Sequence, residues 1–225
     1  MFYSFIIPCF NRADEVHQLL DSFSRLNVPP STSFEIILVD GSPTEILQPI
    51  IQKYATTLPV HHKHKPKLAI SPSPNLGAQL AKGDYLVFLD SDVILPPEYL
   101  MQVDAFLQKN NTDSFGGPDK AHESFTDTQK AISYAMTSFL TTGGIRGGKQ
   151  HLHQFHPRGF NMGIRKSVFN AVSGYSSMTC GEDIELSIRI IKAGYKAQLN
   201  PDAFVYHKRR STFKSFFRQV YRFGA

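Results

Sequence analysis

The sequence has little cysteine and no long apolar run. Cys9 and Cys180 are its only cysteines, too few for a disulfide framework, and we expect both to be reduced, small and buried. Apolar runs such as Tyr85–Leu89 are too short for a transmembrane helix. The first residues show neither a basic leader nor a cleavage site, so we expect no secretory signal and a cytoplasmic location.

Outside the last residues of the chain there is no excess of basic over acidic side chains. Six of the 24 lysines and arginines lie within residues 207–225, a stretch without acidic residues. The rest of the chain has 18 basic and 19 acidic residues, which gives it a net charge of −1. Nucleic-acid binding needs basic side chains spread over the fold. The charge distribution therefore argues against a nucleic-acid partner.

The composition predicts one substantial hydrophobic core. The chain has 225 residues, of which 41% are hydrophobic and 19% charged, so a single large α/β domain is favoured over two small ones. We expect this domain to span 1–210, with a ligand-binding half at 1–95 and a second half at 96–210. A basic amphipathic helix is expected at 211–225.

Strand and helix patterns alternate in the first half. Short apolar or β-branched runs predict strands at Phe5–Cys9, Phe34–Val39, Pro59–Lys63 and Asp84–Leu89. Helical spacing of apolar residues predicts helices at Ala13–Asn27, Glu45–Leu58 and Leu76–Lys82. Such alternation is typical of βαβ units, so the sequence indicates a mostly parallel sheet flanked by helices.

The second half shows a different pattern. Helices are predicted at Pro97–Lys109, Glu123–Leu140, Lys166–Ala171 and Gly181–Ala193, and strands at Gly159–Ile164 and Ala203–His207. In the helix before Gly194, we expect Ile184, Ile188 and Ile191 to face inward. The segment Thr142–Pro157 lacks periodicity and is predicted to be a loop that closes over bound substrates.

Acidic residues follow the predicted strand that ends at Leu89. Asp90-Ser91-Asp92 places two carboxylates directly after a buried strand, where parallel sheets bind ligands. One interpretation is a Mg²⁺ or Mn²⁺ site on a diphosphate. The other is a turn whose aspartates cap the next helix.

Two further features have similar alternatives. Glu182 and Asp183 open a predicted helix, where acids complement the helix dipole or supply a general base. His207 ends the last predicted strand and is either a structural histidine or a further ligand to the cation.

Together these motifs resemble the family 2 glycosyltransferases with the GT-A fold. The similarity runs from about residue 3 to the end of the chain, and its specificity comes from six motifs in the right order. They are Ile6–Arg12, Val39–Asp40, Asn75–Gly77 with Ala81–Tyr85, Asp90–Asp92, Gly159–Gly163 with Arg165, and Gly181–Asp183 with Arg189 and Gly194–Tyr195.

The resemblance implies metal-dependent, inverting transfer of a sugar from a UDP-, GDP- or dTDP-sugar to a saccharide or lipid-linked acceptor, in cell-surface polysaccharide or glycolipid synthesis. It implies Asp183 as general base, with Glu182 beside it. Asp92, Asp90 and His207 are the implied metal ligands. The implied donor-side residues are Pro8, Phe10, Asn11, Arg12, Asp40, Asn75, Gly77, Asp90 and Ser91.

The chain departs from the family pattern near the expected nucleotide. After the second strand it has Asp40-Gly41-Ser42-Pro43, with one acid where the family commonly has two. Ser73-Pro74 precede Asn75, where an arginine is common in the family. Both departures leave the nucleotide base open.

Three alternative functions were compared with this interpretation. A sugar-nucleotidyltransferase needs a glycine-rich basic loop, and Pro8–Asp14 has no glycine. A non-catalytic nucleotide-sugar-binding module does not need Asp92 and Asp183, and a scaffold that recruits partners through its tail leaves these acids unexplained.

Two features lie outside these motifs: a cluster of histidines and an aromatic, basic tail. His151, His153 and His156 could form a zinc site. In the tail, one predicted helical face carries Phe213, Phe216, Phe217, Val220 and Tyr221, beside a basic row of Lys214, Arg218 and Arg222. Such a helix either packs on the catalytic core or lies on an anionic membrane surface, and we expect the enzyme to be peripheral to the inner face of a membrane.

Overall fold

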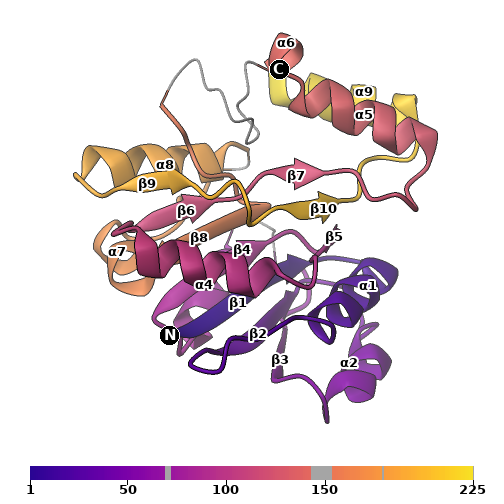
Figure 1. Cartoon of the computed structure of the whole chain (residues 1–225). Coiled ribbons are helices and arrows are strands. Elements are labelled where there is room, and N and C mark those ends of the chain that lie inside the picture. Colours follow the sequence, from indigo (N-terminus) through magenta and orange to yellow (C-terminus); the bar gives the residue numbers. More distant parts are fainter. Residues whose placement is uncertain (69–71, 143–153, 179, 225) are drawn as a thin grey trace.

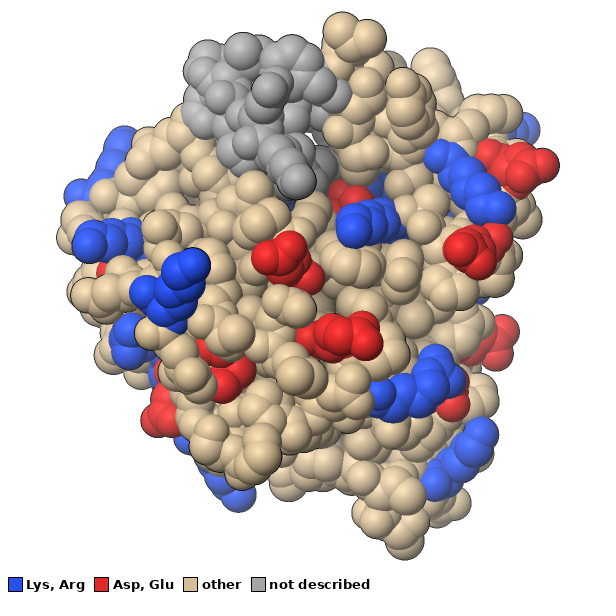
Figure 2. All heavy atoms as spheres, in the orientation of Figure 1, with Lys and Arg blue, Asp and Glu red and all other residues tan. Residues whose placement is uncertain are grey.

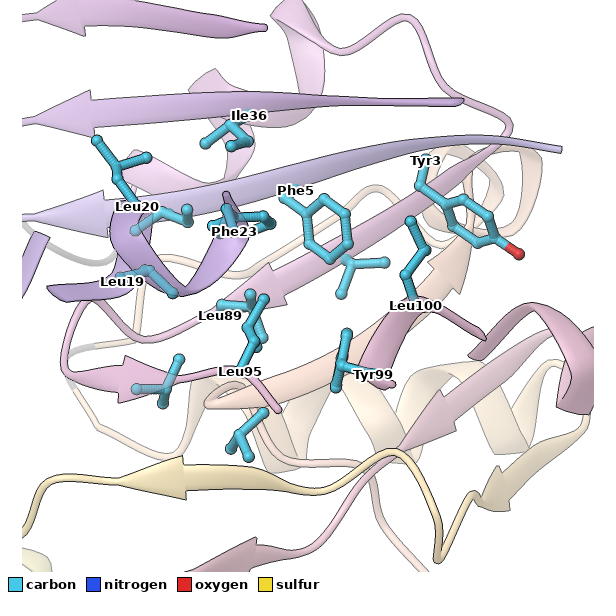
Figure 3. Close-up of a cluster of buried hydrophobic side chains, with 14 of the residues drawn as sticks. Tyr3, Phe5, Leu19, Leu20, Phe23, Ile36, Leu89, Leu95, Tyr99 and Leu100 are labelled. Atoms are coloured by element: carbon cyan, nitrogen blue, oxygen red, sulfur yellow. The ribbon is translucent and has the colours of Figure 1, made fainter. Parts of the chain in front are cut away.

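Strand β1 (Phe2–Cys9) is an interior strand of the main sheet, and its two faces contribute to two separate buried clusters. Successive side chains of a strand point to opposite faces, so Phe5 and Ile7 join one buried cluster and Ile6 joins the other. Figure 3 shows the first cluster, where the Phe5 and Phe23 rings meet edge to face with centroids 4.9 Å apart. This packing fixes β1 and therefore the turn that follows it.

The first half forms the parallel part of the sheet. Its strands are β1, β2 (Ser33–Asp40), β3 (Val60–His64) and β4 (Tyr85–Leu89). They pair in parallel in the order β3-β2-β1-β4. The helices are α1 (Ala13–Phe23), α2 (Gln48–Tyr54) and α3 (Ser73–Leu80). All five residues of β4 are buried, as the sequence predicts for a strand covered on both faces.

The second half extends this sheet and adds a smaller one (Figure 1). Its strands are β5 (Val93–Ile94), β6 (Ser114–Gly116), β7 (Asp119–Lys120), β8 (Asn161–Arg165), β9 (Ala197–Leu199) and β10 (Val205–His207). Its helices are α4 (Tyr99–Lys109), α5 (Asp127–Thr137), α6 (Phe139–Thr142), α7 (Lys166–Ala171), α8 (Glu182–Lys192) and α9 (Phe213–Gly224).

The sheet as a whole is mixed. Strand β8 runs antiparallel to both β4 and β6, and β9 runs parallel to β6. In the described part of the chain the main sheet has the order β3-β2-β1-β4-β8-β6-β9, and the second sheet has the order β5-β10-β7. Helices cover both faces, which confirms the predicted α/β class with a mostly parallel sheet.

The computed structural model describes residues 1–68, 72–142, 154–178 and 180–224. Most of the segment 142–157, expected to be a closing loop, lies outside the described residues. So do His151 and His153 of the expected zinc cluster, whereas His156 is described. Both expectations therefore stay predictions.

Two helix predictions need correction. The single helix expected at Glu123–Leu140 is two helices, because Thr126 caps the start of α5 and Ser138 is extended with ψ of 137°. In α8 the buried residues are Leu186, Ser187 and Ile190, whereas Ile188 is exposed. Because Ser187 is small, the buried face of α8 can lie close to the backbone at Pro157. The Ser187 hydroxyl donates a hydrogen bond to the carbonyl of Pro157 at 2.7 Å.

Two surface properties follow from the described residues. None of the described helices combines the length and apolar character that crossing a bilayer requires. Figure 2 shows acidic and basic side chains interspersed over one face of the molecule. Strand β4 of the first expected part pairs directly with β8 of the second, so the two parts share one sheet. The division into residues 1–95, 96–210 and 211–225 stays a prediction.

Candidate active site

A cleft of about 810 Å³ opens where β1 and β4 end. Its lining comes from the turn after β1, the loop after β4, the start of α8 and the chain around the end of β10. The residues singled out by the sequence that line it are Pro8, Phe10, Arg12, Asp90, Ser91, Asp92, Glu182, Asp183 and His207. The fold therefore brings the predicted metal and base groups, and part of the predicted donor side, into one cleft.

Three side chains on one wall could together hold a cation. The ligand atoms of Asp90, Asp92 and His207 all lie within 4.8 Å of one another. Nε2 of His207 is 3.2 Å from Oδ1 of Asp92 and 3.6 Å from Oδ2 of Asp90. The antiparallel pairing of β10 with β5 sets this geometry, because it places His207 opposite Val93, the residue after Asp92.

Basic side chains surround Asp92 and compensate its negative charge. Burial by itself raises the pKa of the Asp92 carboxyl, but His207, Arg12 and Arg210 outweigh burial and hold the pKa below its ordinary value. Nη1 of Arg12 lies 3.8 Å from Oδ2 of Asp92. Asp92 therefore stays ionised at neutral pH, the state that a metal ligand requires.

Asp119 lies behind His207, and the sequence motifs did not indicate it. It is buried, and its Oδ2 is 3.6 Å from Nδ1 of His207. Arg209 forms an ion pair with the same carboxylate. Burial lowers the pKa of Arg209 to about 10, although the Asp92 charge raises it, so the guanidinium is protonated at neutral pH. In the sequence, the available signal for Asp119 was its place directly after Gly116-Gly117-Pro118, residue types that are typical of turns.

A second acidic group, Glu182 and Asp183, opens α8 and lines the same cleft. Gly181 precedes the helix with φ of +78°, a left-handed conformation that glycine adopts without strain. The amide of Gly159 donates to Oδ2 of Asp183 at 3.0 Å, and Nε of Arg158 lies 3.9 Å from the same oxygen. Burial raises the pKa of Glu182, and the Asp183 charge raises it further. Arg158, which also lines the cleft, is a second residue that sequence reasoning missed.

The turn after β1 supplies an aromatic and a cationic side chain. Phe10 is 42% exposed and lines the cleft beside Pro8. Arg12 is held by Glu15, whose Oε1 is 2.8 Å from Nη1. An exposed aromatic ring beside an arginine is suited to stacking on a nucleobase and pairing with a phosphate.

Asp40 and Asn11 are placed differently. Asp40 is fully buried, and its Oδ1 accepts a hydrogen bond from the amide of Ser42 at 2.9 Å. Its Oδ2 lies 3.5 Å from Nε2 of His62. Asn11 has φ of +52°, and its amide donates to the Ser42 hydroxyl at 2.8 Å. Neither residue is among the described lining residues of the cleft, so their donor contacts stay predictions.

Asn75 and Gly77 support the wall of the cleft. The Asn75 side chain donates to the carbonyl of Tyr175 at 2.8 Å and accepts from its amide at 2.9 Å. A Cβ on Gly77 would lie 2.4 Å from Cγ2 of Ile6, so α3 approaches β1 closely at this point. Among the residues that the structure describes, neither lines the cleft, and donor contact again stays a prediction.

Comparison with known proteins agrees with this architecture. Residues 4–173 match the model of glycosyl transferase family 2. The succinoglycan biosynthesis protein ExoA of Rhizobium meliloti (strain 1021) is 27% identical over 223 residues, which cover 97% of this chain and 67% of the relative.

Two solved structures share the fold. The mannosyltransferase PcManGT from Pyrobaculum calidifontis, in complex with GDP-Man and Mn²⁺, has a TM-score of 0.71 at 15% identity, covering 96% of this chain and 59% of that one. S. aureus TarS 1–349 in complex with UDP-GlcNAc has a TM-score of 0.69 at 20% identity, covering 94% and 60%. This chain therefore spans about 60% of the length of either structure, and the likeness confirms the GT-A fold.

The family match includes most of β1, all of β4 and the residues Asp90–Asp92, but it ends before Asp183 and His207. The structure adds these two residues to the same cleft. Since the match extends over most of the sequence, the chain belongs to glycosyl transferase family 2.

Proposed function

We propose that this protein transfers a sugar from a nucleotide-sugar donor to an acceptor hydroxyl, with inversion at the anomeric carbon and with the help of a divalent cation. The observation that carries the proposal is the placement of two acidic groups in one cleft. Asp90 and Asp92, with His207, lie on one wall, and Asp183 lies at the start of α8.

The donor half of the proposal rests on the turn after β1. The exposed ring of Phe10 is suited to contact the nucleobase, and Arg12 adds positive charge near the diphosphate. The two similar structures were solved with GDP-Man and with UDP-GlcNAc. A nucleoside diphosphate sugar is therefore the donor class that we propose here.

The donor set of the acidic wall fits Mg²⁺ or Mn²⁺. Carboxylate oxygens are ligands that these hard cations prefer, and the imidazole of His207 adds a third ligand. Asp92 is held ionised, as ligation requires. When bound, the cation would supply electrostatic stabilisation of the charge that develops on the departing nucleoside diphosphate.

Asp183 is proposed as the general base. Its carboxylate accepts the proton of the acceptor hydroxyl while the acceptor oxygen bonds to the anomeric carbon and the bond to the diphosphate breaks. The amide of Gly159 and the guanidinium of Arg158 both face Oδ2 and orient the carboxylate. A base acting opposite the leaving group requires no covalent intermediate, so one displacement inverts the anomeric configuration.

Asp119 is proposed as a positioning residue. It contacts Nδ1 of His207, which leaves Nε2 directed at Asp90 and Asp92. A carboxylate on the far nitrogen of a metal-binding histidine fixes the orientation of its ring and raises its basicity. Arg209 balances the buried charge of Asp119.

The biological setting that we propose is synthesis of a cell-surface polysaccharide or glycolipid. The support is the similarity to ExoA, which is named for succinoglycan biosynthesis. The chain spans about 60% of the length of the solved structures, so the substrates of the whole protein are part of this proposal.

The proposal is tested by incubating the protein with UDP-, GDP- and dTDP-sugars, Mn²⁺ and a panel of saccharide and lipid-linked acceptors, and by detecting both released nucleoside diphosphate and glycosylated acceptor. We expect release with one donor class, loss of release on chelation, and loss in Asp183→Asn. Release of pyrophosphate from a sugar phosphate and a nucleoside triphosphate would instead indicate a nucleotidyltransferase.

A further inference from the structure

Apolar side chains are exposed on three helices beside one another, α5, α6 and α9. Among the described residues, every large hydrophobic side chain that is more than half exposed lies on one of them: Tyr134, Leu140, Phe213, Phe217 and Tyr221. Elsewhere in the described part such exposure reaches 46% at most, at Met101. Figure 1 shows α5 and α9 side by side, beyond the β5-β10-β7 sheet. Concentrated apolar exposure of this kind marks an interaction surface.

The exposed residues of α9 form one stripe, which we call the outer face of α9. It consists of Phe213, Phe217, Val220 and Tyr221, whose helical spacing places them on one side, and all four are exposed. Phe217 is 70% exposed and Tyr221 is 67% exposed. The packing of α9 on the catalytic core therefore leaves this face uncovered in the described structure.

A basic row lies next to the outer face. Lys214 and Arg218 are exposed, and each follows an aromatic residue of the face by one position, which places them along its edge. Residues 207–225 contain six basic side chains and no acid. Two copies of this segment would repel each other, whereas an anionic surface would attract it.

We propose that the outer face of α9 docks on the surface of a bilayer that contains anionic phospholipid. The aromatic rings lie among the headgroups and upper acyl chains, and Lys214 and Arg218 pair with headgroup phosphates. Amphipathic helices with aromatics on one face and basic residues beside them bind membranes in this way, by apolar burial plus attraction to anionic lipid.

The same helix reaches the cleft. Gln219 of α9 lines it, as do Lys208 and Arg210 of the preceding segment. A bilayer held along the outer face therefore lies close to the cleft. For the transfer reaction proposed above, this brings a lipid-linked acceptor within reach, a consequence that rests on the proposed function, whereas docking itself does not.

The test is sedimentation with vesicles of phosphatidylcholine alone and of phosphatidylcholine mixed with phosphatidylglycerol, without donor or metal. We expect binding to the mixed vesicles and much weaker binding to the neutral ones. In Lys214→Gln/Arg218→Gln, the partition coefficient should fall about 25-fold, since each basic residue near the headgroups contributes roughly fivefold. In Phe217→Ser/Tyr221→Ser, it should fall roughly tenfold or more per ring.

Matched controls separate this surface from general effects. Met101→Ser and Lys109→Gln change exposed residues of α4 and should bind vesicles like the wild type. Circular dichroism confirms folding of each variant. Binding of nucleoside diphosphate with Mn²⁺ should be the same in all of them, and its absence in the wild type would concern the proposed function alone.

Three results would overturn the proposal. They are no binding of the wild type to the mixed vesicles, undiminished binding by both double variants of α9, and a wild-type dimer in solution that Phe217→Ser/Tyr221→Ser dissociates. The last result would identify a second copy of the chain as the occupant of the outer face.

Discussion

Nδ1 of His207 lies 3.6 Å from Oδ2 of Asp119, so the imidazole has a carboxylate behind it as well as in front. A buried carboxylate on this nitrogen holds the ring in place. We predict that Asp119→Asn lowers the affinity for Mn²⁺ by about 10–100-fold, measured by calorimetric titration. The control is Asp127→Asn, an exposed position at the start of α5, which should leave the affinity unchanged. Unchanged affinity in Asp119→Asn would show that Asp119 is purely structural.

Asp183→Asn should separate catalysis from binding. The amide side chain keeps the shape of the carboxylate but cannot accept the hydroxyl proton, so the transfer rate should fall about 10²–10⁴-fold. The affinity for nucleoside diphosphate should stay the same, because Asp183 is assigned to the acceptor side. Rate and affinity are measured on the same preparation, beside the exposed control Asp202→Asn. A parallel loss of both would mean that Asp183 maintains the fold of the cleft.

Glu182 should make stability depend on pH. Burial and the Asp183 charge raise its pKa above the ordinary 4.5, so ionisation is harder in the folded state than in the unfolded chain. Its contribution to stability is therefore full below the unfolded pKa and is lost as the pH rises through the folded pKa.

It follows that Glu182→Gln should raise the melting temperature at neutral pH and change it little near about pH 4. Thermal unfolding at both pH values measures the difference. The exposed Glu123→Gln is the comparison variant. A melting temperature that Glu182→Gln shifts equally at both pH values would contradict the assigned burial.

Gly77→Ala should destabilise the fold although alanine favours helices. The added Cβ would meet Cγ2 of Ile6 at 2.4 Å and Cγ2 of Val39 at 3.2 Å. Such overpacking costs about 1–3 kcal/mol, more than the helix propensity that alanine gains. Urea unfolding should show a lower free energy of unfolding, with little change in Gln79→Ala, an exposed position of the same helix. Equal stability of the two variants would show that α3 can move away from β1.

Much of the first half was predictable because its signals are local. The runs that form β1, β2 and β4 are strongly apolar, and Pro49 lies in the first turn of α2, where a helix tolerates proline. Predicted boundaries differ by a few residues, since helix ends depend on caps and contacts. Helix α3, for example, begins at Ser73 with Pro74 in its first turn, whereas the apolar spacing predicted a start at Leu76.

The second half was less predictable because its strands are held by distant partners. Strands β5 and β7 have two residues each, too short for any periodicity, and both form by pairing with β10. In α8, the stripe of Ile184, Ile188 and Ile191 has the right spacing for an inward face. The packing of Leu186 and Ile190 against the sheet instead determines which face is buried.

The residues of the candidate site were predictable where several acidic side chains lie close together in the sequence. Asp90, Asp92 and the Glu182–Asp183 pair are readable as local signals, and resemblance to the family linked them with His207. Asp119 and Arg158 belong to no such motif. Their contacts with His207 and Asp183 arise only in the folded chain, for Asp119 through the pairing of β7 with β10. Asp40 is placed by its own buried contacts and is not among the described lining residues of the cleft.

The most direct test of the central claim is calorimetric titration of UDP and GDP into the wild type, Asp92→Ala and Asp183→Asn, each with Mn²⁺ and with a chelator. The account predicts that one nucleotide binds the wild type with Mn²⁺, that chelation or Asp92→Ala abolishes most of this binding, and that Asp183→Asn preserves it. Binding of equal strength with the chelator, or in Asp92→Ala with Mn²⁺, would contradict it.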